Sequence, residues 1–212
     1  MVERATGLIL RTRLLTETSL IVNWLTADLG RISTVAKGAR RPKSSFRGKL
    51  DLFYLADFSF RRSPRSDLHT LNEVSVHQFH SALREELTHL QQASYFVRLI
   101  EQTTETETPL PTFFQLVAGA LDYLPRQIAQ NSTVYAFEIK LLAELGLSPV
   151  LAESRLTAGS REILRKLLAS DWEQLSRLKL SPAQSREIDL YLFHIMSGNW
   201  RKVLPSRSAA LS

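Results

Sequence analysis

Among the residues whose side chains could take part in binding or catalysis, six positively charged ones lie close together in the sequence. Lysines and arginines occupy six of the thirteen positions from Lys37 to Lys49, and no acidic residue lies among them. We call residues 37–49 the basic loop, because two glycines and Pro42 disfavour a continuous helix or strand there. Six like charges repel one another until an anion neutralises them, so the loop could bind a phosphate backbone. The alternative is that these charged side chains only face solvent, as they do in most runs of charged residues.

Other side chains could extend such a surface. A second polar loop and the first predicted strand supply further arginines. Phe46 could stack on a base, since a core position is hard to arrange inside a charged loop. The candidate nucleic-acid contacts are Lys37, Arg40, Arg41, Lys43, Phe46, Arg47 and Lys49 in the basic loop, with Arg11, Arg13, Arg61, Arg62 and Arg65 outside it.

The excess positive charge is confined to the first part of the chain. Residues 1–80 hold 13 lysines and arginines against 7 acidic residues, whereas residues 81–212 hold 14 of each. The whole net charge of +6 therefore belongs to the first part. Such an asymmetry is typical of nucleic-acid binders.

The composition also excludes some classes of protein. The sequence contains no cysteine, which rules out disulfides and cysteine-ligated zinc. Its start lacks the apolar core of a signal peptide, and no run approaches the roughly 18 apolar residues of a membrane span. We expect a soluble, cytoplasmic protein.

Short segments rich in β-branched and aliphatic residues predict strands in residues 1–80. Five strands without a helix between them predict a closed barrel, because closure removes the sheet edges. The OB-fold is the small barrel of this kind most used for single-stranded nucleic acid. The predicted strands are Thr6–Arg13, Ser19–Thr26, Arg31–Ala36, Leu50–Phe60 and Leu68–Val76.

Aromatic residues on these strands have predictable positions. Trp24 is expected in the core rather than as a stacking platform. Only one of the neighbours Phe53 and Tyr54 can face the core of a regular strand, because adjacent side chains point to opposite sides.

From residue 81 the apolar period changes from two to about 3.6, which predicts helices. The chain is therefore predicted to be α+β with two domains, an OB-fold barrel over 1–80 and an all-α bundle over 81–212. Ser81, Pro111 and Gly146 are placed as helix boundaries. The predicted helices lie near 81–100, 111–124, 132–145, 161–169, 171–178 and 182–198.

Patterns for catalysis or metal binding are weak. Neither a phosphate-binding glycine loop nor a Gly-x-Ser-x-Gly turn occurs. His77 and His80 have no acidic ligand at a matching spacing. Glu101, Glu105 and Glu107 fall in a Thr-rich helix exit and are expected to form a solvated linker. We expect no catalytic residue, metal or cofactor.

Several segments together resemble the RecO family of bacterial recombination mediators. The specific match is Val35–Ser44, which reads Val-Ala-Lys-Gly-Ala-Arg-Arg-Pro-Lys-Ser. The supporting matches are Leu8–Arg13, Glu17–Val22, Gly30–Arg31, Leu141–Pro149 and Leu180–Pro182. The resemblance covers nearly the whole chain.

This resemblance implies an OB-fold and a helical domain in a protein that binds single- and double-stranded DNA and anneals complementary strands. It also implies work with RecR, RecF and the single-strand binding protein to load the recombinase RecA, at the nucleoid. The neutral helical domain, with Phe113-Phe114, leaves room for a partner groove that takes the acidic, apolar tail of the single-strand binding protein. The DNA contacts implied by the family's basic segment are Lys37, Arg40, Arg41 and Lys43.

The chain departs from the family pattern at two places. Many relatives carry a four-cysteine zinc module where Val150–Ser160 is short and free of cysteine. The Pro-Tyr-Gly that commonly precedes a glutamate is replaced by Leu14-Leu15-Thr16, so the first turn is expected to differ.

Three other functions fit the same sequence. One is an RNA-binding OB-fold protein of translation or RNA processing, which a site for the 2′-hydroxyl would favour. The second is a nuclease, and the third is a protein-docking module for which DNA is secondary.

Overall fold

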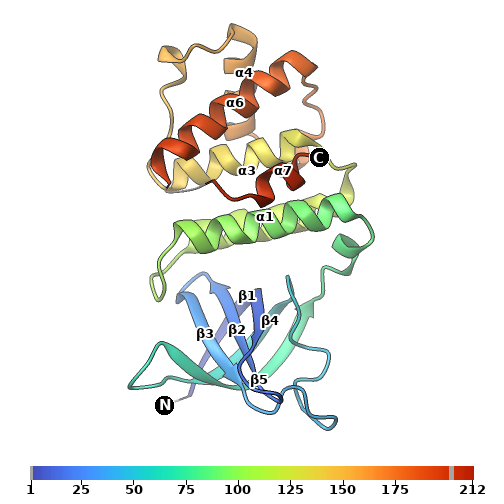
Figure 1. Cartoon of the computed structure of the whole chain (residues 1–212), viewed down its shortest axis with the longest axis vertical. Helices are drawn as coiled ribbons and strands as arrows, with labels where there is room; N and C mark the ends of the chain where they lie inside the picture. Colours follow the sequence, from blue (N-terminus) through green and yellow to red (C-terminus); the bar gives the residue numbers. More distant parts are fainter. Residues whose placement is uncertain (1, 201–202) are drawn as a thin grey trace. The chain divides into compact units, whose positions relative to one another are not determined.

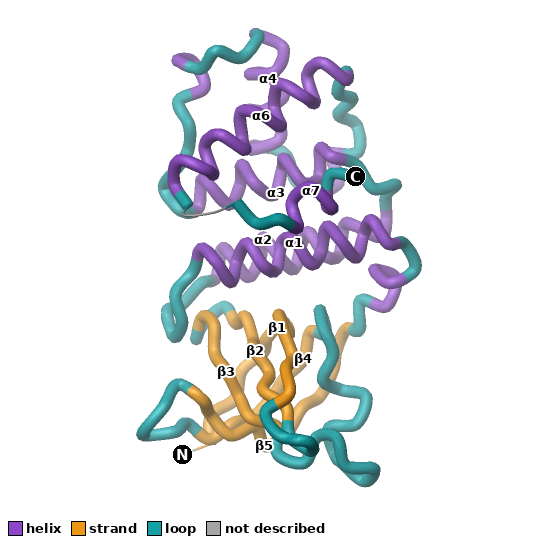
Figure 2. The backbone as a smooth tube through the Cα atoms, viewed as in Figure 1, coloured by secondary structure: helices purple, strands orange, loops and turns teal. Residues whose placement is uncertain are grey.

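The computed structural model describes residues 2–200 and 203–212. The chain divides into two compact units (Figures 1 and 2). The barrel unit comprises residues 1–81 and 100–118, and the helical unit comprises residues 82–99 and 119–212. The predicted α+β class, with a barrel first and helices after it, is confirmed.

The strands close into a barrel in the order β1-β2-β3-β5-β4. The long β1 closes it, because its first half pairs with β4 and its second half with β2, both antiparallel. One short parallel pairing, between β3 and β5, completes the ring. The predicted OB-fold is thereby confirmed. The strands are β1 (Val2–Leu14), β2 (Leu20–Thr26), β3 (Gly30–Ala36), β4 (Leu55–Arg61) and β5 (Leu68–Gln78).

Trp24 lies at the centre of the barrel core, as predicted. Its side chain is fully buried and stacks on Phe58 with ring centroids 4.0 Å apart. Its indole N–H donates to Thr34 Oγ1 at 2.8 Å, so the one polar atom of the ring is satisfied.

The fourth strand starts later than the sequence predicts, at Leu55 rather than Leu50. A turn precedes it, in which the Tyr54 N–H donates to the carbonyl of Asp51. Phe53 adopts a φ of 68°, a conformation in which strand alternation does not apply. Its side chain is consequently buried, whereas Tyr54 is only half-buried.

The segment after α1 (Leu87–Thr103) lies against the barrel. Residues 105–109 are exposed, as expected of a solvated linker, but backbone hydrogen bonds attach the segment to the barrel. The Glu107 N–H donates to the carbonyl of Arg31, and the Leu110 N–H donates to the carbonyl of Ala27, both at 2.9 Å. Gly30 permits this approach, because a Cβ at that position would meet the carbonyl oxygen of Thr108 at 1.8 Å. We call residues 101–110 the docked linker.

The helical unit is built around α3 (Asn131–Glu144), which is buried along most of its length and packs on α4 and α6. The α6 helix begins with a capping box, in which Ser181 and Gln184 satisfy each other's backbone N–H groups. Among the described residues, no helix is both long and apolar enough to cross a bilayer. The other helices are α2 (Pro111–Tyr123), α4 (Ala158–Ala169), α5 (Trp172–Leu175), α6 (Pro182–Asn199) and α7 (Ser206–Ala210).

A buried ionic cluster ties α7 to α3. Arg207 donates two hydrogen bonds to the carboxylate of the fully buried Glu138, at 2.7 and 3.0 Å. The hydroxyl of Tyr95 donates to the same carboxylate, and Asp189 accepts from Arg207 at 2.6 Å. Burial raises the pKa of Tyr95 far above its ordinary range. No pattern in the sequence indicated α7.

Candidate nucleic-acid interface

The basic loop is held against the barrel by two apolar side chains on its inner side. Phe46 is 8% exposed and Ala39 is 9% exposed, and both belong to the same core cluster as Trp24 and Phe58. The expectation that Phe46 has no core position is therefore wrong. Its ring anchors the loop and is not free to stack on a base in this conformation.

The start of the basic loop is bonded to the turn between β1 and β2. The Arg40 N–H donates to the Thr18 carbonyl at 3.0 Å, and its guanidinium donates to the Glu17 carbonyl at 2.9 Å. The Gly38 N–H donates to Ser19 Oγ at 3.3 Å. Gly38 has a φ of 66°, so this bend favours glycine. The loop is therefore positioned by the backbone N–H groups of Gly38 and Arg40 and by the guanidinium of Arg40.

The cations of the basic loop face outwards. Lys37, Arg40, Arg41, Lys43 and Arg47 are exposed, and Lys49 is half-buried. Within residues 2–200 and 203–212, none of the six forms an ion pair with a carboxylate. Charges without a partner in the protein can be neutralised by an external anion at no cost of breaking an ion pair.

A cleft of about 600 Å³ runs along the basic loop. Three guanidinium groups line it, and apolar side chains form its floor, which suits a chain of phosphates with sugars and bases attached. Tyr54 is the half-buried aromatic residue in it. Its lining residues are Leu20, Ala39, Arg40, Arg41, Pro42, Phe46, Arg47, Gly48, Leu50, Asp51 and Tyr54.

Two of the arginines outside the basic loop are bound to carboxylates. Arg11 pairs with Glu101 of the docked linker at 2.5 Å. Arg62 pairs with Glu3 at 2.9 Å and with Glu107 at 2.7 Å. The hydrogen bonds from Arg62 lower the pKa of the Glu3 carboxyl. These two arginines already have anions beside them.

The remaining candidate contacts are exposed. Arg13 lies on β1, Arg61 ends β4, and Arg65 lies in the loop that follows. The structure brings none of these three into the cleft of the basic loop.

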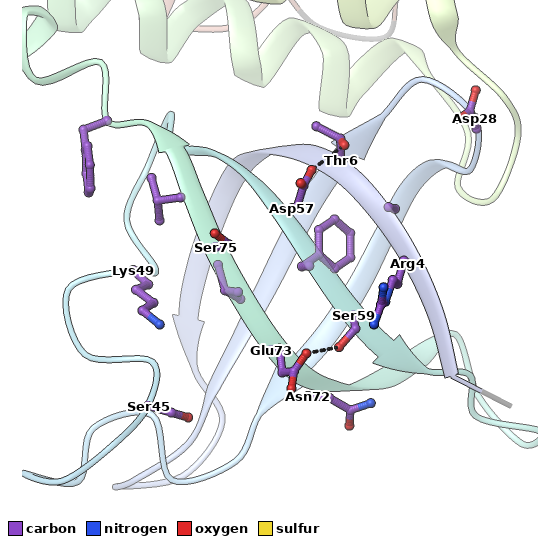
Figure 3. A pocket seen from close by; sticks show the side chains of 15 residues that line it. Arg4, Thr6, Asp28, Ser45, Lys49, Asp57, Ser59, Asn72, Glu73 and Ser75 are labelled. Carbon is purple, nitrogen blue, oxygen red and sulfur yellow. Dashed lines mark hydrogen bonds between the residues drawn. The ribbon is translucent and has the colours of Figure 1, made fainter.

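A groove of about 1000 Å³ in the barrel unit has mixed charge (Figure 3). Lys49 reaches it from the basic loop, and Arg4 stands on the other side. Between them Asp57 accepts hydrogen bonds from Thr6 and His77, which lower its pKa. Glu73 adds a second carboxylate. Because carboxylates repel phosphates, this groove suits nucleic acid less well than the cleft does.

The contacts of the docked linker with barrel arginines were not revealed by the sequence. A glutamate in a Thr-rich stretch reads as solvated, and only the tertiary structure places Glu101 and Glu107 beside barrel arginines. The described residues hold no group of three or more histidines and carboxylates arranged to bind a metal ion.

A closed OB-fold barrel with an outward-facing cationic loop, followed by a helical unit, defines an OB-fold protein with an exposed cationic surface. Two family models match this chain, "Recombination protein O N terminal" over residues 1–80 and "Recombination protein O C terminal" over residues 84–157. The chain belongs to the RecO family of DNA repair proteins.

Curated relatives agree with this membership. The DNA repair protein RecO of Salinibacter ruber is 29% identical, over 98% of this chain and 92% of that protein. RecO of Rhodopirellula baltica is 33% identical, over 75% of this chain and 58% of that protein. RecO of Bacillus pumilus is 26% identical, over 93% and 79% respectively.

Proposed function

We propose that this protein is a DNA-binding mediator of recombinational repair that acts without catalysing a reaction of its own. The observation that carries the proposal is the row of outward-facing cations on the basic loop, which have no carboxylate partner among the described residues. Family membership supports DNA as the polyanion.

Binding through these cations is independent of base sequence, because phosphate contacts position a strand without reading its bases. Single- and double-stranded DNA both present phosphates to the loop. Annealing follows from the same charge, since two complementary strands repel each other less when a cationic surface neutralises both.

The proposed partners are those that the family resemblance implies. They are RecR, the single-strand binding protein through its acidic and apolar tail, and RecF. In this scheme the barrel holds DNA while the neutral helical unit receives a protein partner, so that RecA can replace the single-strand binding protein. The proposed place of action is the nucleoid in the cytoplasm.

Annealing of complementary strands coated with single-strand binding protein tests the proposal. The wild-type chain should accelerate annealing, and the variant Lys37→Glu/Arg40→Glu/Arg41→Glu should lose the acceleration. A matched triple variant on a neutral surface of the helical unit, Glu162→Gln/Arg165→Gln/Lys166→Gln, should anneal like the wild type. Equal annealing by the loop variant and the wild type would reject the basic loop as the DNA site.

Two further measurements distinguish the proposed function from RNA binding and from nuclease activity. Competition with RNA of the same sequence should show no preference for RNA, and incubation of labelled DNA with magnesium should give no cleavage. A strong RNA preference or magnesium-dependent cleavage would replace the proposal by an RNA-binding or a nuclease function.

A further inference from the structure

A second, smaller hollow lies beside the basic loop, at the turn between β1 and β2. Its volume is about 420 Å³. The turn supplies three hydroxyl side chains, and the basic loop supplies two cations. The lining residues are Leu15, Thr16, Thr18, Ser19, Val35, Lys37, Gly38 and Arg41.

The hydroxyl groups of this hollow have protons to donate. Thr16 Oγ1 accepts the Ser19 N–H at 3.1 Å, and Ser19 Oγ accepts the Gly38 N–H at 3.3 Å. A hydroxyl that accepts with a lone pair keeps its own O–H for another acceptor. Neither of these O–H groups, nor that of Thr18, donates to an acceptor within the described parts of the chain.

The charged residues of the hollow are of one sign. Lys37 and Arg41 line it, and no aspartate or glutamate does. The residues that line the hollow therefore carry three hydroxyl groups, an ammonium and a guanidinium, and no carboxylate. A tetrahedral oxyanion, which carries several acceptor oxygens and negative charge, matches this set of donors.

We propose that this hollow is a phosphate pocket, in which Thr16, Thr18 and Ser19 hold one phosphate group of a DNA strand together with Lys37 and Arg41. The inference rests on the proposed function. Arg41 also lines the 600 Å³ cleft with Tyr54, so the nucleotides next to this phosphate lie in the cleft.

Thr16 belongs both to the turn and to the hollow. Its hydroxyl oxygen accepts the backbone N–H groups of Thr18 and Ser19, which closes the β1–β2 turn, and the residue lines the hollow. The turn is held to the basic loop by the bonds of Gly38 and Arg40. The donors are thus positioned before the ligand arrives, which lowers the entropic cost of binding.

The test compares hydroxyl removal with charge removal in the full chain. Thr18→Val removes a hydroxyl that closes no bond of the turn, whereas Thr18→Ser retains it. Affinity for a fluorescent single-stranded oligonucleotide is measured at several salt concentrations. Ser75→Ala, an exposed hydroxyl in the mixed-charge groove, is the matched control.

Thr18→Val should weaken binding about three- to tenfold without changing the salt slope, because the lost hydrogen bond carries no charge. Lys37→Gln should reduce the magnitude of the slope by about 0.7. Thr18→Ser and Ser75→Ala should bind like the wild type. If Thr18→Val binds normally while Lys37→Gln is weakened, the pocket is rejected and the proposed function stands. If the wild type binds and no variant alters binding, both the pocket and Lys37 are rejected as DNA contacts. If the wild type does not bind, the proposed function fails.

A second measurement distinguishes a strand phosphate from a free anion. Backbone amide NMR signals of residues 16–19 are followed during titration with the oligonucleotide and, separately, with inorganic phosphate at constant ionic strength. The pocket predicts shifts with the oligonucleotide at concentrations at least a hundredfold lower. Equal concentrations for both ligands would overturn the assignment to DNA.

Discussion

The cations of the basic loop and the arginines beside the docked linker carry the same charge but have different electrostatic surroundings. Lys37, Arg40 and Arg41 face outwards without carboxylate partners in the described residues, whereas Arg11 and Arg62 are paired with glutamates. A count of lysines and arginines along the sequence does not distinguish the unpaired cations from the paired ones. The comparison shows that the carboxylates brought in by tertiary structure decide which cations remain available to a polyanion.

The largest expected effect separates the two groups directly. Lys37→Gln/Arg40→Gln/Arg41→Gln should weaken single-stranded DNA binding about a hundredfold at 0.1 M salt and flatten the salt slope by about 2, because three phosphate contacts are lost. Arg11→Gln/Arg62→Gln should weaken binding less than about threefold, since those charges are already offset. Affinity by fluorescence anisotropy against salt measures both. Similar losses in the two variants would remove the distinction between the groups.

The second-largest effect is expected from substitutions of Phe46, which test whether the basic loop depends on an apolar anchor. Phe46→Ala should lower the free energy of unfolding by about 2–4 kcal/mol, because a core side chain is truncated. Phe46→Leu should cost less than about 1.5 kcal/mol, since most of the volume is kept. Denaturant unfolding measures this difference.

DNA binding by the same variant distinguishes the anchor from a stacking platform. Phe46→Leu should retain wild-type affinity if the ring serves the core. A fivefold or greater loss of affinity with unchanged stability would instead show that the ring stacks on a base.

The docked linker offers a smaller effect of opposite sign. Glu101→Gln/Glu107→Gln removes the carboxylates beside Arg11 and Arg62, so DNA affinity should rise about three- to tenfold and the salt slope should steepen. The variant Glu105→Gln, at an exposed glutamate of the same linker, is the control. Weaker binding by the double variant would contradict masking of these arginines.

The smallest expected effect is a change with pH in the stability that the Arg62–Glu3 pair contributes. Arg62 lowers the pKa of Glu3 from its ordinary value of 4.5, so the pair stabilises the barrel above pH 4.5 and the contribution is lost as pH falls through the lower folded value. Both groups are partly exposed, so Arg62→Gln should cost less than about 1 kcal/mol at pH 7. The cost should vanish near pH 2. Denaturant unfolding of variant and wild type at both pH values checks this sign.

Local patterns predicted most elements of the fold. Segments rich in β-branched and aliphatic residues identified the five strands, although β4 begins at Leu55 rather than Leu50, and Trp24 is buried as expected. The capped start of α6 followed from Ser181-Pro182. These features depend on residues near one another in the sequence, for which periodicity and caps are informative.

Features that depend on distant residues were not predictable in this way. Phe46 is in the core because the loop folds back over the barrel, and Glu101 meets Arg11 across 90 positions of sequence. Phe53 was predicted to lie on the fourth strand, but β4 begins only at Leu55 and Phe53 has a positive φ. A short stretch of sequence does not indicate contacts between distant residues. The basic loop could therefore be predicted as the site, but which cations are paired with carboxylates could not.

The ionic cluster of the helical unit has a consequence for the order of events during synthesis. Glu138 and its partner Arg207 are 69 positions apart. While a ribosome makes the chain, α3 emerges first, with a carboxyl group whose burial without a partner is costly. The core of the bundle is therefore expected to become stable only when Arg207 has been added. The barrel strands have no such requirement, so the growing chain is expected to present a formed barrel while its helices still await their closing residue.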